Sequence, residues 1–405
     1  MVNIAVLGYG TVGSGVVEVI NTNLESINKK AGREIGIKYV LDLRDFPGDP
    51  VEKILVHDYD IILNDPEVRI VVEVMGGVEP AYTFVKQALL AGKSVCTSNK
   101  ELVAKHGPEL NEIARMNHIN FLYEASVGGG IPIIRPLNSS LTADEIIEIT
   151  AILNGTTNYI LTKMAQEGLS FDSALKNAQA LGYAERNPEA DIEGYDACRK
   201  IAILSSLAYG NHVDFEEIYT EGISKITPED IEYAKKMNYA IKLLASANRE
   251  GDNFYAMVAP FLVPVNHPLY PVNEVFNAIF VKGNVLGDVM FYGSGAGKLP
   301  TASAVVSDVV DAVKHLHCNI VSFWSSKKLE LTKVDRDHRR FFVRLSGNKD
   351  ERAMEVEKLF GKVEYVQVEN LQGEFGFVTE KLSEEEFNEK SSSIDGFISR
   401  IRMKD

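Results

Sequence analysis

The 405-residue sequence has little of what marks membrane, secreted or nucleic-acid-binding proteins. No apolar run approaches the roughly 18 residues that a membrane helix needs, and the apolar stretch at residues 2–8 is too short for a secretion signal. Acidic residues outnumber basic ones, 57 to 42, so a net charge of −15 gives no general basic field for nucleic acid or anionic lipid. We therefore expect a soluble, cytoplasmic protein that binds neither.

Cysteine is also scarce. Cys96, Cys198 and Cys318 are far apart and show no metal-binding spacing, which predicts unpaired thiols in a reducing compartment. The sequence has no internal repeat of fixed period and no low-complexity tract. Its length and its 45% content of hydrophobic residues predict two or three globular domains.

The N-terminal segment VNIAVLGYGTVGSGVVEVI reads as a strand, a glycine-rich turn and a helix. Gly8, Gly10 and Gly13 have GxGxxG spacing, in which the first glycine allows a tight turn, the second lets the backbone approach a pyrophosphate and the third lets helix pack on strand. The helix N-terminus offers N–H groups to the phosphates. This context predicts a dinucleotide site.

The second predicted strand ends with Asp42 and Arg44. An acid at this place would bind the ribose 2′-hydroxyl of NAD, whereas an arginine would favour the 2′-phosphate of NADP. Because both residues are present, the sequence leaves the choice of cofactor open.

A parallel, doubly wound α/β sheet is predicted from alternating strands and helices. Further strands are predicted at 60–64, 69–77 and 93–103, with a helix at 80–91. Ligands of such sheets lie beyond the carboxyl ends of the strands, where Gly76, Gly77 and the run Thr97 to Lys100 are expected. Lys100 would then face the cofactor crevice, and the alternative is a solvated lysine that opens the next helix.

From Tyr123 the pattern changes, which predicts a domain boundary. The glycines at 128–130, beside Glu124, either expose carbonyl oxygens that can hold a hard cation or only make a tight turn before a helix at Pro132. The next strand, 145–153, runs into Asn154, Gly155 and Thr156 and then a helix. This second strand-loop-helix unit predicts a site for a substrate carboxylate.

The segment ERNPEADIEGYDACRK, residues 185–200, is where we expect the chemistry. Pro188 and Gly194 break any earlier helix, so a regular helix is predicted from about Asp196 to about Tyr209. Asp196 and Lys200 then share one face with apolar residues, and a partly buried lysine loses its proton more readily than one in water. Lys200 is thus a candidate proton donor, with an ordinary surface ion pair as the alternative.

The rest of the chain predicts an antiparallel sheet covered by helices and then a compact tail. A helical segment is predicted at 228–250, strands at 253–264 and 278–292, and a long helix at 300–316. His315 and His317, two residues apart, do not face each other on a helix and are expected to be solvated. After a polar link at 325–338, residues 339–405 show the order βαββαβ.

Six motifs in this order resemble the homoserine dehydrogenase family over residues 1–325: GYGTVG, TSNKELV, YEASVGGGIP, LNGTTNYI, GYAERNPEADIEGYDACRK and FYGSGAGKLPTASAV. The resemblance implies reversible, NAD- or NADP-dependent reduction of L-aspartate 4-semialdehyde to L-homoserine. It also implies a Rossmann domain at 1–125 completed by a helix at about 301–325, a substrate and dimerisation domain at 126–300, and a homodimer or homotetramer.

Carried over by position, the resemblance implies roles for individual residues. The catalytic set is Lys200, Asp196 and Lys100. The substrate set is Glu185, Asp191, Asn154, Gly155 and Thr156. The cofactor set is Gly8, Gly10, Thr11, Val12, Gly13, Arg44, Ser98, Lys100 and Gly295. A sodium ion is implied near Glu124, Val127, Gly129 and Ile131, mostly through backbone oxygens.

The tail at 339–405 resembles an ACT domain, which implies that it senses an amino acid, threonine being usual in the family. Its first loop lacks the Pro-Gly turn often seen at such effector sites, so the alternative is a tail that only strengthens oligomerisation. If the tail senses threonine, removing it should abolish inhibition and spare activity. Two alternatives remain for the whole chain: another Rossmann-type amino-acid dehydrogenase, or a non-catalytic NAD(P)-sensing regulator.

Overall fold

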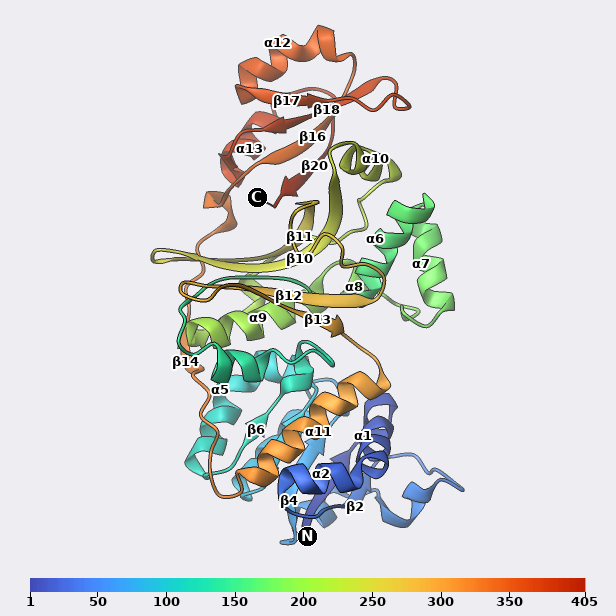
Figure 1. Cartoon of the computed structure of the whole chain (residues 1–405), viewed down its shortest axis with the longest axis vertical. Coiled ribbons are helices and arrows are strands. Elements are labelled where there is room, and N and C mark those ends of the chain that lie inside the picture. Colours follow the sequence, from blue (N-terminus) through green and yellow to red (C-terminus); the bar gives the residue numbers. More distant parts are fainter. Residues whose placement is uncertain (405) are drawn as a thin grey trace.

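The computed structural model describes residues 1–404 and shows an elongated molecule built in three parts (Figure 1). A parallel sheet with its helices lies at the N-terminal end, an antiparallel sheet lies in the middle, and the tail lies at the far end. The C-terminus returns to the junction between the middle sheet and the tail.

The N-terminal part is the predicted doubly wound sheet. Its strand order is β3-β2-β1-β4-β5-β6, all parallel. The strands are β1 (Val2–Leu7), β2 (Ile35–Leu41), β3 (Leu55–Val56), β4 (Val68–Glu73), β5 (Ser94–Thr97) and β6 (Phe121–Leu122). The helices are α1 (Thr11–Thr22), α2 (Leu24–Ala31), α3 (Tyr59–Leu63), α4 (Ala81–Leu90), α5 (Lys100–Met116) and, from far along the chain, α11 (Lys298–Lys314).

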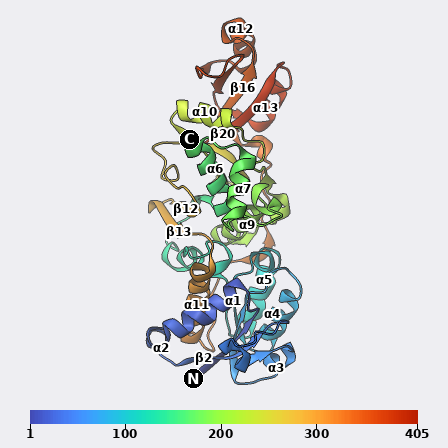
Figure 2. The same ribbon diagram turned by 90° about the vertical axis from the view of Figure 1, so that its right-hand side faces the viewer.

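The helices cover both faces of this sheet. Figure 2 shows α1, α2 and α11 on one side and α3, α4 and α5 on the other. The first group packs on alternate strand residues such as Ile4 and Val6, and the second on the intervening ones such as Ala5 and Leu7. Each central strand is therefore buried on both faces, as the near-continuous apolar runs of parallel strands require.

The predicted strand at 60–64 is wrong, because these residues lie in the helix α3. The Asp58 side chain accepts a hydrogen bond from the Asp60 N–H and caps that helix. The edge strand is instead Leu55–Val56, a two-residue strand that was not predicted.

The middle part is a mainly antiparallel sheet that continues into the tail, in the order β13-β12-β7-β10-β11-β20-β16-β18-β17, with β9 also pairing with β11. Its middle strands are β7 (Ile146–Ile152), β9 (Tyr219–Thr220), β10 (Tyr239–Glu250), β11 (Asn253–Pro264), β12 (Phe276–Gly283) and β13 (Gly287–Ser294). The helices of this part are α6 (Gly155–Glu167), α7 (Phe171–Ala180), α8 (Glu189–Ile192), α9 (Tyr195–Tyr209) and α10 (Pro228–Lys236). The long helix α9 packs against β7, β10 and β11, and α11 connects the sheet back to the first domain.

The prediction of a helix over 228–250 is only half correct. The helix α10 ends at Lys236, Asn238 takes a positive φ of 62°, and Tyr239–Glu250 is the strand β10. β10 lies inside the sheet between β7 and β11, so seven successive residues from Ile241 to Ala247 are buried. A strand buried on both faces lacks the alternation that would have distinguished it from a helix.

The tail has the predicted βαββαβ order, and its strands pair as β20-β16-β18-β17. Its main elements are β16 (Phe341–Ser346), α12 (Lys349–Phe360), β17 (Val363–Val366), β18 (Glu374–Thr379), α13 (Glu384–Ser391) and β20 (Phe397–Met403). Short two-stranded pairings join β8 (Asn211–His212) to β14 (Ser325–Lys328) and β15 (His338–Arg339) to β19 (Leu382–Ser383). The last strand also pairs in parallel with β11 through Phe261 and Arg402, so the tail and the middle sheet are one continuous sheet.

Within residues 1–404, the structure contains no helix that is both long enough and apolar enough to cross a bilayer.

Candidate active site

The glycine-rich loop between β1 and α1 has the geometry that a dinucleotide requires. Gly8 has φ +95°, and a Cβ at Gly13 would lie 1.9 Å from the Gly8 carbonyl oxygen. A Cβ at Gly10 would meet nothing within 4 Å, so the loop is open to an approaching pyrophosphate there. Thr11 and Val12 begin α1, whose N-cap Gly10 makes no side-chain cap hydrogen bond, so the first N–H groups of the helix are available to an anion. The residues present therefore fit an NAD(P) molecule.

Asp42 and Arg44 interact with each other at the end of β2. The Arg44 guanidinium donates two hydrogen bonds to the Asp42 carboxylate, from Nε to Oδ1 and from NH2 to Oδ2, each with a length of 3.0 Å. The Tyr9 N–H donates a third, to Oδ2, with a length of 2.8 Å. Hydrogen bonds from Arg44 hold the pKa of Asp42 well below its usual range, although partial burial opposes this. A carboxylate and a guanidinium thus lie together at the end of β2, the place where Rossmann-type sheets commonly contact the 2′ group of the ribose.

Glu73 is a buried acid that the sequence reasoning did not single out. It ends β4, with no exposed surface, and its carboxylate accepts from the Met75 N–H at 2.8 Å and the Thr97 hydroxyl at 2.6 Å. Thr97 Oγ1 accepts from the Asn99 N–H, and Asn99 caps the helix that begins with Lys100. Burial raises the pKa of Glu73, although these hydrogen bonds oppose the rise. A charged residue inside the apolar run RIVVEVMGG was the available signal.

Lys200, Asp196 and Lys100 meet where the two domains face each other. Lys200 Nζ lies 2.7 Å from Asp196 Oδ2 and donates to the Leu153 carbonyl over 2.8 Å. Lys100, from the nucleotide domain, reaches Asp196 Oδ1 at 2.6 Å. An ammonium group has three N–H donors, so Lys200 retains one for a bound ligand. The alternative of an ordinary surface ion pair does not hold, because Asp196 is 4% and Lys200 is 9% exposed.

The charges in this cluster shift one another's proton affinities. Burial lowers the pKa of Lys200 and the Lys100 charge adds to that effect, while Asp196 opposes it. The pKa of Lys100 is raised: burial acts against its charge, but the Asp196 carboxylate outweighs burial. The pKa of Asp196 is lowered, because Lys200 and Lys100 outweigh its own burial. Of the two lysines, Lys200 is therefore the one that releases its proton more readily.

The residues predicted to bind substrate lie in part around the same cluster. Asn154 caps α6 with its side-chain oxygen, and its amide donates to Asp191 Oδ1 at 2.7 Å and to Asp196 Oδ2 at 3.1 Å. Burial and the nearby Asp196 raise the pKa of Asp191. The Thr156 hydroxyl is directed away, to the Tyr183 carbonyl at 2.6 Å.

Glu185 and Gly155 are placed differently. Glu185 is exposed, and among the hydrogen bonds described for residues 1–404 its backbone carbonyl accepts one from the Gln179 side chain. Gly155 opens α6, and a Cβ there would lie 2.8 Å from the Val275 carbonyl oxygen, so the position excludes a larger residue. The structure therefore assembles Asn154, Asp191 and Asp196 directly and leaves Glu185 on a surface segment.

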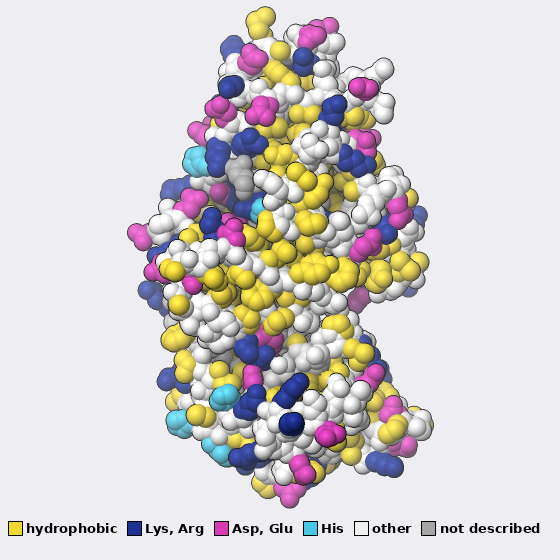
Figure 3. Space-filling view, in the orientation of Figure 1, with side chains coloured by type: hydrophobic (Ala, Val, Ile, Leu, Met, Phe, Trp, Pro, Cys, Tyr) yellow, Lys and Arg dark blue, Asp and Glu magenta, His cyan; other side chains and the backbone are white. Residues whose placement is uncertain are grey.

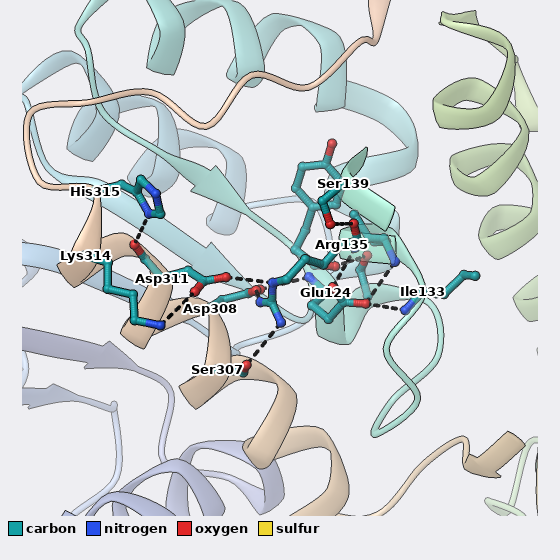
Figure 4. Close-up of polar contacts among 12 residues, drawn as sticks. Glu124, Ile133, Arg135, Ser139, Ser307, Asp308, Asp311, Lys314 and His315 are labelled. Carbon is teal, nitrogen blue, oxygen red and sulfur yellow. Dashed lines mark hydrogen bonds and ion pairs between the residues drawn. The ribbon is translucent and has the colours of Figure 1, made fainter. Parts of the chain in front are cut away.

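The glycine turn after β6 is braced by a buried polar network (Figure 4). The Glu124 carboxylate accepts the N–H groups of Ile133, Ile134 and Arg135 at 2.6–2.9 Å. The Arg135 guanidinium extends to Asp308 at 2.7 Å on α11, and the Glu124 N–H donates to the same aspartate. Burial, with the nearby Glu124, raises the pKa of Asp308 well above its usual value.

This turn has oxygen atoms suited to a hard cation, from its backbone carbonyls and beside the Glu124 carboxylate, which already accepts three N–H groups. Among the loop hydrogen bonds described for residues 1–404, none is accepted by the carbonyl oxygens of Val127 or Gly129. Gly129 packs directly against the backbone of Gly295, because a Cβ at residue 129 would lie 2.2 Å from the Gly295 carbonyl oxygen. Carbonyl oxygens are ligands that hard cations accept, so the residues present fit such an ion.

Comparisons with known proteins point to one family. A family model described as homoserine dehydrogenase matches residues 132–310, and one described as its NAD binding domain matches residues 8–124. A homoserine dehydrogenase of Bacillus subtilis is 43% identical over 324 residues, which are 79% of this chain and 74% of that one. One of Helicobacter pylori is 44% identical over 345 residues, 85% of this chain and 81% of that one.

Solved structures agree. A homoserine dehydrogenase from Thiobacillus denitrificans superposes with a TM-score of 0.92 at 36% identity, covering 100% of this chain and 98% of that one. A hyperthermophilic archaeal homoserine dehydrogenase in complex with NADPH superposes over 77% of this chain and 97% of that one, with a TM-score of 0.66 at 31% identity. These matches favour neither a different amino-acid dehydrogenase nor a non-catalytic regulator. The chain belongs to the homoserine dehydrogenase family.

Proposed function

We propose that Lys200 is the general acid of this homoserine dehydrogenase, and that Asp196 and Lys100 position and tune it. As a member of its family, the chain is an NAD(P)-dependent oxidoreductase that interconverts L-aspartate 4-semialdehyde and L-homoserine. The proposal rests above all on the arrangement in which two lysines from different domains bind the two oxygens of the buried Asp196.

In the reducing direction, the third N–H of Lys200 donates to the aldehyde oxygen of the substrate. As negative charge develops on that oxygen, Lys200 transfers its proton, which its burial makes easier to release. Asp196 and the Leu153 carbonyl hold the Lys200 side chain in place through their hydrogen bonds. When bound, the nicotinamide supplies the hydride.

The amino-acid part of the substrate is bound beside this cluster, by Asp191 and by the start of α6. Asp191 binds the substrate ammonium group, held by Asn154, and the free N–H groups at the start of α6 favour its carboxylate. Glu185 joins this set only if its surface segment approaches the substrate. Gly8, Gly10, Gly13, Ser98 and Gly295 line the cofactor crevice, and Arg44 binds a 2′-phosphate, so that NADP is accepted along with NAD.

Three further properties extend the proposal. A sodium ion, held by backbone oxygens at Glu124, Val127, Gly129 and Ile131, stiffens the turn next to Gly295. The protein forms a homo-oligomer, which is supported by the hydrophobic band across the middle part in Figure 3. Phe276 on β12 and Met290 and Tyr292 on β13 are large exposed hydrophobic side chains of this sheet. The protein works in the cytoplasm. Threonine acts as an effector that depends on the tail.

The test is oxidation of NADPH and of NADH by the full chain with L-aspartate 4-semialdehyde. Propanal, an aldehyde without the amino-acid group, is the matched control substrate. We expect turnover with the semialdehyde and much slower turnover with propanal, because only the former can bind Asp191 and α6. Absence of turnover with both nucleotides would contradict the proposal.

A further inference from the structure

A buried lysine in the middle part of the molecule has only neutral partners. Lys242, on β10, is 2% exposed, although lysine is almost never fully buried unless it is paired with an acid. Its ammonium group donates to three uncharged oxygens: the Val272 carbonyl, Asn273 Oδ1 at 3.0 Å and Asn158 Oδ1 at 3.3 Å. Burial alone lowers the pKa of Lys242 to about 8, so no acid of residues 1–404 offsets that shift.

The charged groups on the elements around Lys242 are engaged elsewhere. Those on α6, on α10 and on the loop before β12 form ion pairs of their own: Lys163 with Glu167 and Glu274, and Asp230 with Arg344. His267 of the same loop is neutral at pH 7, because burial lowers its pKa. β11 places the apolar Phe261 opposite Lys242. The positive charge of Lys242 is therefore uncompensated below about pH 8.

The partners of Lys242 tie it to the first turn of α6. Asn158 lies one turn after Asn154, the N-cap of that helix, which is roughly 6 Å along the axis. The Asn158 amide also donates to the carbonyls of Glu274 at 3.0 Å and of Phe276 at 3.1 Å. Lys242 thus lies beside the start of α6, at the point where the loop before β12 is fastened to this helix.

This position of Lys242 is unfavourable for the protein alone. A buried charge without an acid costs free energy, and the first turn of a helix carries a partial positive charge that repels a cation. An anion at the start of α6 offsets both costs, because the helix and the lysine attract it together. Features that conflict with folding rules are expected at functional sites, so Lys242 indicates an anionic ligand at α6.

We propose that Lys242 is a positioning residue for the substrate, whose positive charge beside the first turn of α6 strengthens the binding of the substrate carboxylate. Lys242 acts through the helix and does not touch the substrate. The inference rests on the proposed place of the carboxylate at the start of α6, and it is independent of the proposed role of Lys200. Because Lys242 loses its proton at about pH 8, substrate affinity should fall as pH rises through that value.

A structural brace without an electrostatic effect is the alternative role of Lys242. The two roles differ in their response to charge. At a separation of roughly 10–15 Å and an effective dielectric constant of about 20, one unit charge changes affinity for a carboxylate about five- to twentyfold. A brace would act through hydrogen bonds, which neither a change of pH nor a nearby negative charge would remove.

The experiment is calorimetric titration of the full chain with L-homoserine in saturating NADPH, a pair that cannot react with each other. It is done at about pH 7 and about pH 9.5, on either side of the Lys242 pKa of about 8. Lys242→Met removes the charge and keeps the length of the side chain. Asn273→Asp keeps the acceptor that lies 3.0 Å from Lys242 Nζ and adds a negative charge beside it.

Two exposed positions give matched controls, Lys176→Met on α7 and Asn388→Asp on α13. Both should bind L-homoserine like the wild type. Thermal denaturation checks that each variant is folded, and if Lys242→Met does not fold, Asn273→Asp decides. Titration of the ligand ammonium group and of Lys200 is common to all the chains, so the ratio of dissociation constants between variant and wild type is compared.

At about pH 7 we expect Lys242→Met to weaken binding about five- to twentyfold. At about pH 9.5 the ratio should approach one, because the wild type has then lost the same charge. Asn273→Asp should also weaken binding at about pH 7, although it keeps the oxygen that accepts from Lys242.

Unchanged affinity in both variants at about pH 7 overturns the proposal. So does weakening by Lys242→Met that is equal at the two pH values, which is the result expected of a structural brace. For Asn273→Asp as the deciding variant, unchanged affinity at about pH 7 overturns it. Turnover is measured separately: normal L-homoserine binding without turnover would contradict the proposed catalytic function and leave the role of Lys242 standing.

Discussion

Lys100 and Lys200 bind the two oxygens of one carboxylate, that of Asp196, at 2.6 and 2.7 Å. The first lysine opens a helix of the nucleotide domain, and the second lies on α9 beneath the middle sheet. Two positive charges so close together are stable only because Asp196 lies between them. The contact between the two domains and the proton affinity of Lys200 therefore both depend on Asp196.

Replacing Lys200 by alanine removes the proposed proton donor. We expect turnover to fall by about 10²–10⁴-fold, the usual contribution of a general acid, while the dissociation constant of the nucleotide is unchanged. Steady-state kinetics and fluorescence titration of NADPH measure the two quantities. Lys176→Ala, at an exposed lysine of α7, is the control. Turnover close to that of the wild type would rule out the role of Lys200.

The charge of Lys100 should set the pH at which Lys200 loses its proton. Lys100 lowers the pKa of Lys200, so Lys100→Met should raise it. Reduction needs protonated Lys200, so its rate falls as pH rises through that pKa, and the fall should move to higher pH in the variant. The measurement is the pH profile of kcat for reduction, with exposed Lys105→Met of the same helix as control. A fall at unchanged or lower pH would contradict this coupling.

Arg44 should discriminate between the two nucleotides. Its guanidinium is 62% exposed, and its bond to Asp42 is one that a 2′-phosphate can compete for. We expect Arg44→Ala to raise the KM for NADPH more than the KM for NADH. Arg33→Ala, at an exposed arginine just before β2, controls for general charge effects. Equal changes for both nucleotides would show that Arg44 does not read the phosphate.

Glu73 should act as a positioning residue for the cofactor crevice. Glu73→Ala leaves the Met75 and Gly76 N–H groups and the Thr97 hydroxyl without their acceptor, so the loops that lead to Lys100 lose their support. We expect the KM for the nucleotide to rise roughly fivefold or more, and Glu73→Gln to restore much of the loss because it keeps one acceptor. Exposed Glu112→Ala is the control. A fall in kcat with unchanged KM would argue against positioning.

The contact between tail and middle sheet should make the stability of the fold fall with decreasing pH. Arg402 is 1% exposed and lies 2.7 Å from Glu221. Burial opposes the charge of Glu221, but Arg402 and Arg400 lower its pKa, so the contact stabilises the fold above about pH 4.3, the unfolded value, and is lost as pH falls through the lower folded value. Glu221→Gln should therefore flatten the acid side of a plot of unfolding free energy against pH. An unchanged slope would contradict this.

The same contact changes the expected result of removing the tail. Deletion of residues 339–405 would take away β20, which pairs with β11, and leave Glu221 without Arg402. Loss of Arg402 leaves the partly buried Glu221 charge without its partner, and loss of β20 leaves β11 without a neighbouring strand, so we expect deletion to destabilise the protein and to lower activity.

Much of the site could be predicted because its signals are local. Gly8, Gly10 and Gly13 lie within six residues, and the spacing of Asp196 and Lys200 places them one turn apart on the same face of α9. The bond from Lys100 to Asp196 and the role of the Leu153 carbonyl joined segments far apart in the chain, so no spacing could predict their distances. Glu73 was missed because an acid within an apolar strand has no sequence partner until Thr97 is folded onto it.

By itself, the sequence determined the glycine-rich turn, the helix from Tyr195 to Tyr209 and the βαββαβ order of the tail, since each follows from local steric limits and from the period of apolar residues. Tertiary structure alone decided that Tyr239–Glu250 is a strand and that β20 pairs with β11. Burial on both faces removes the local pattern, and strand pairing depends on which distant segments can share hydrogen bonds and exclude water.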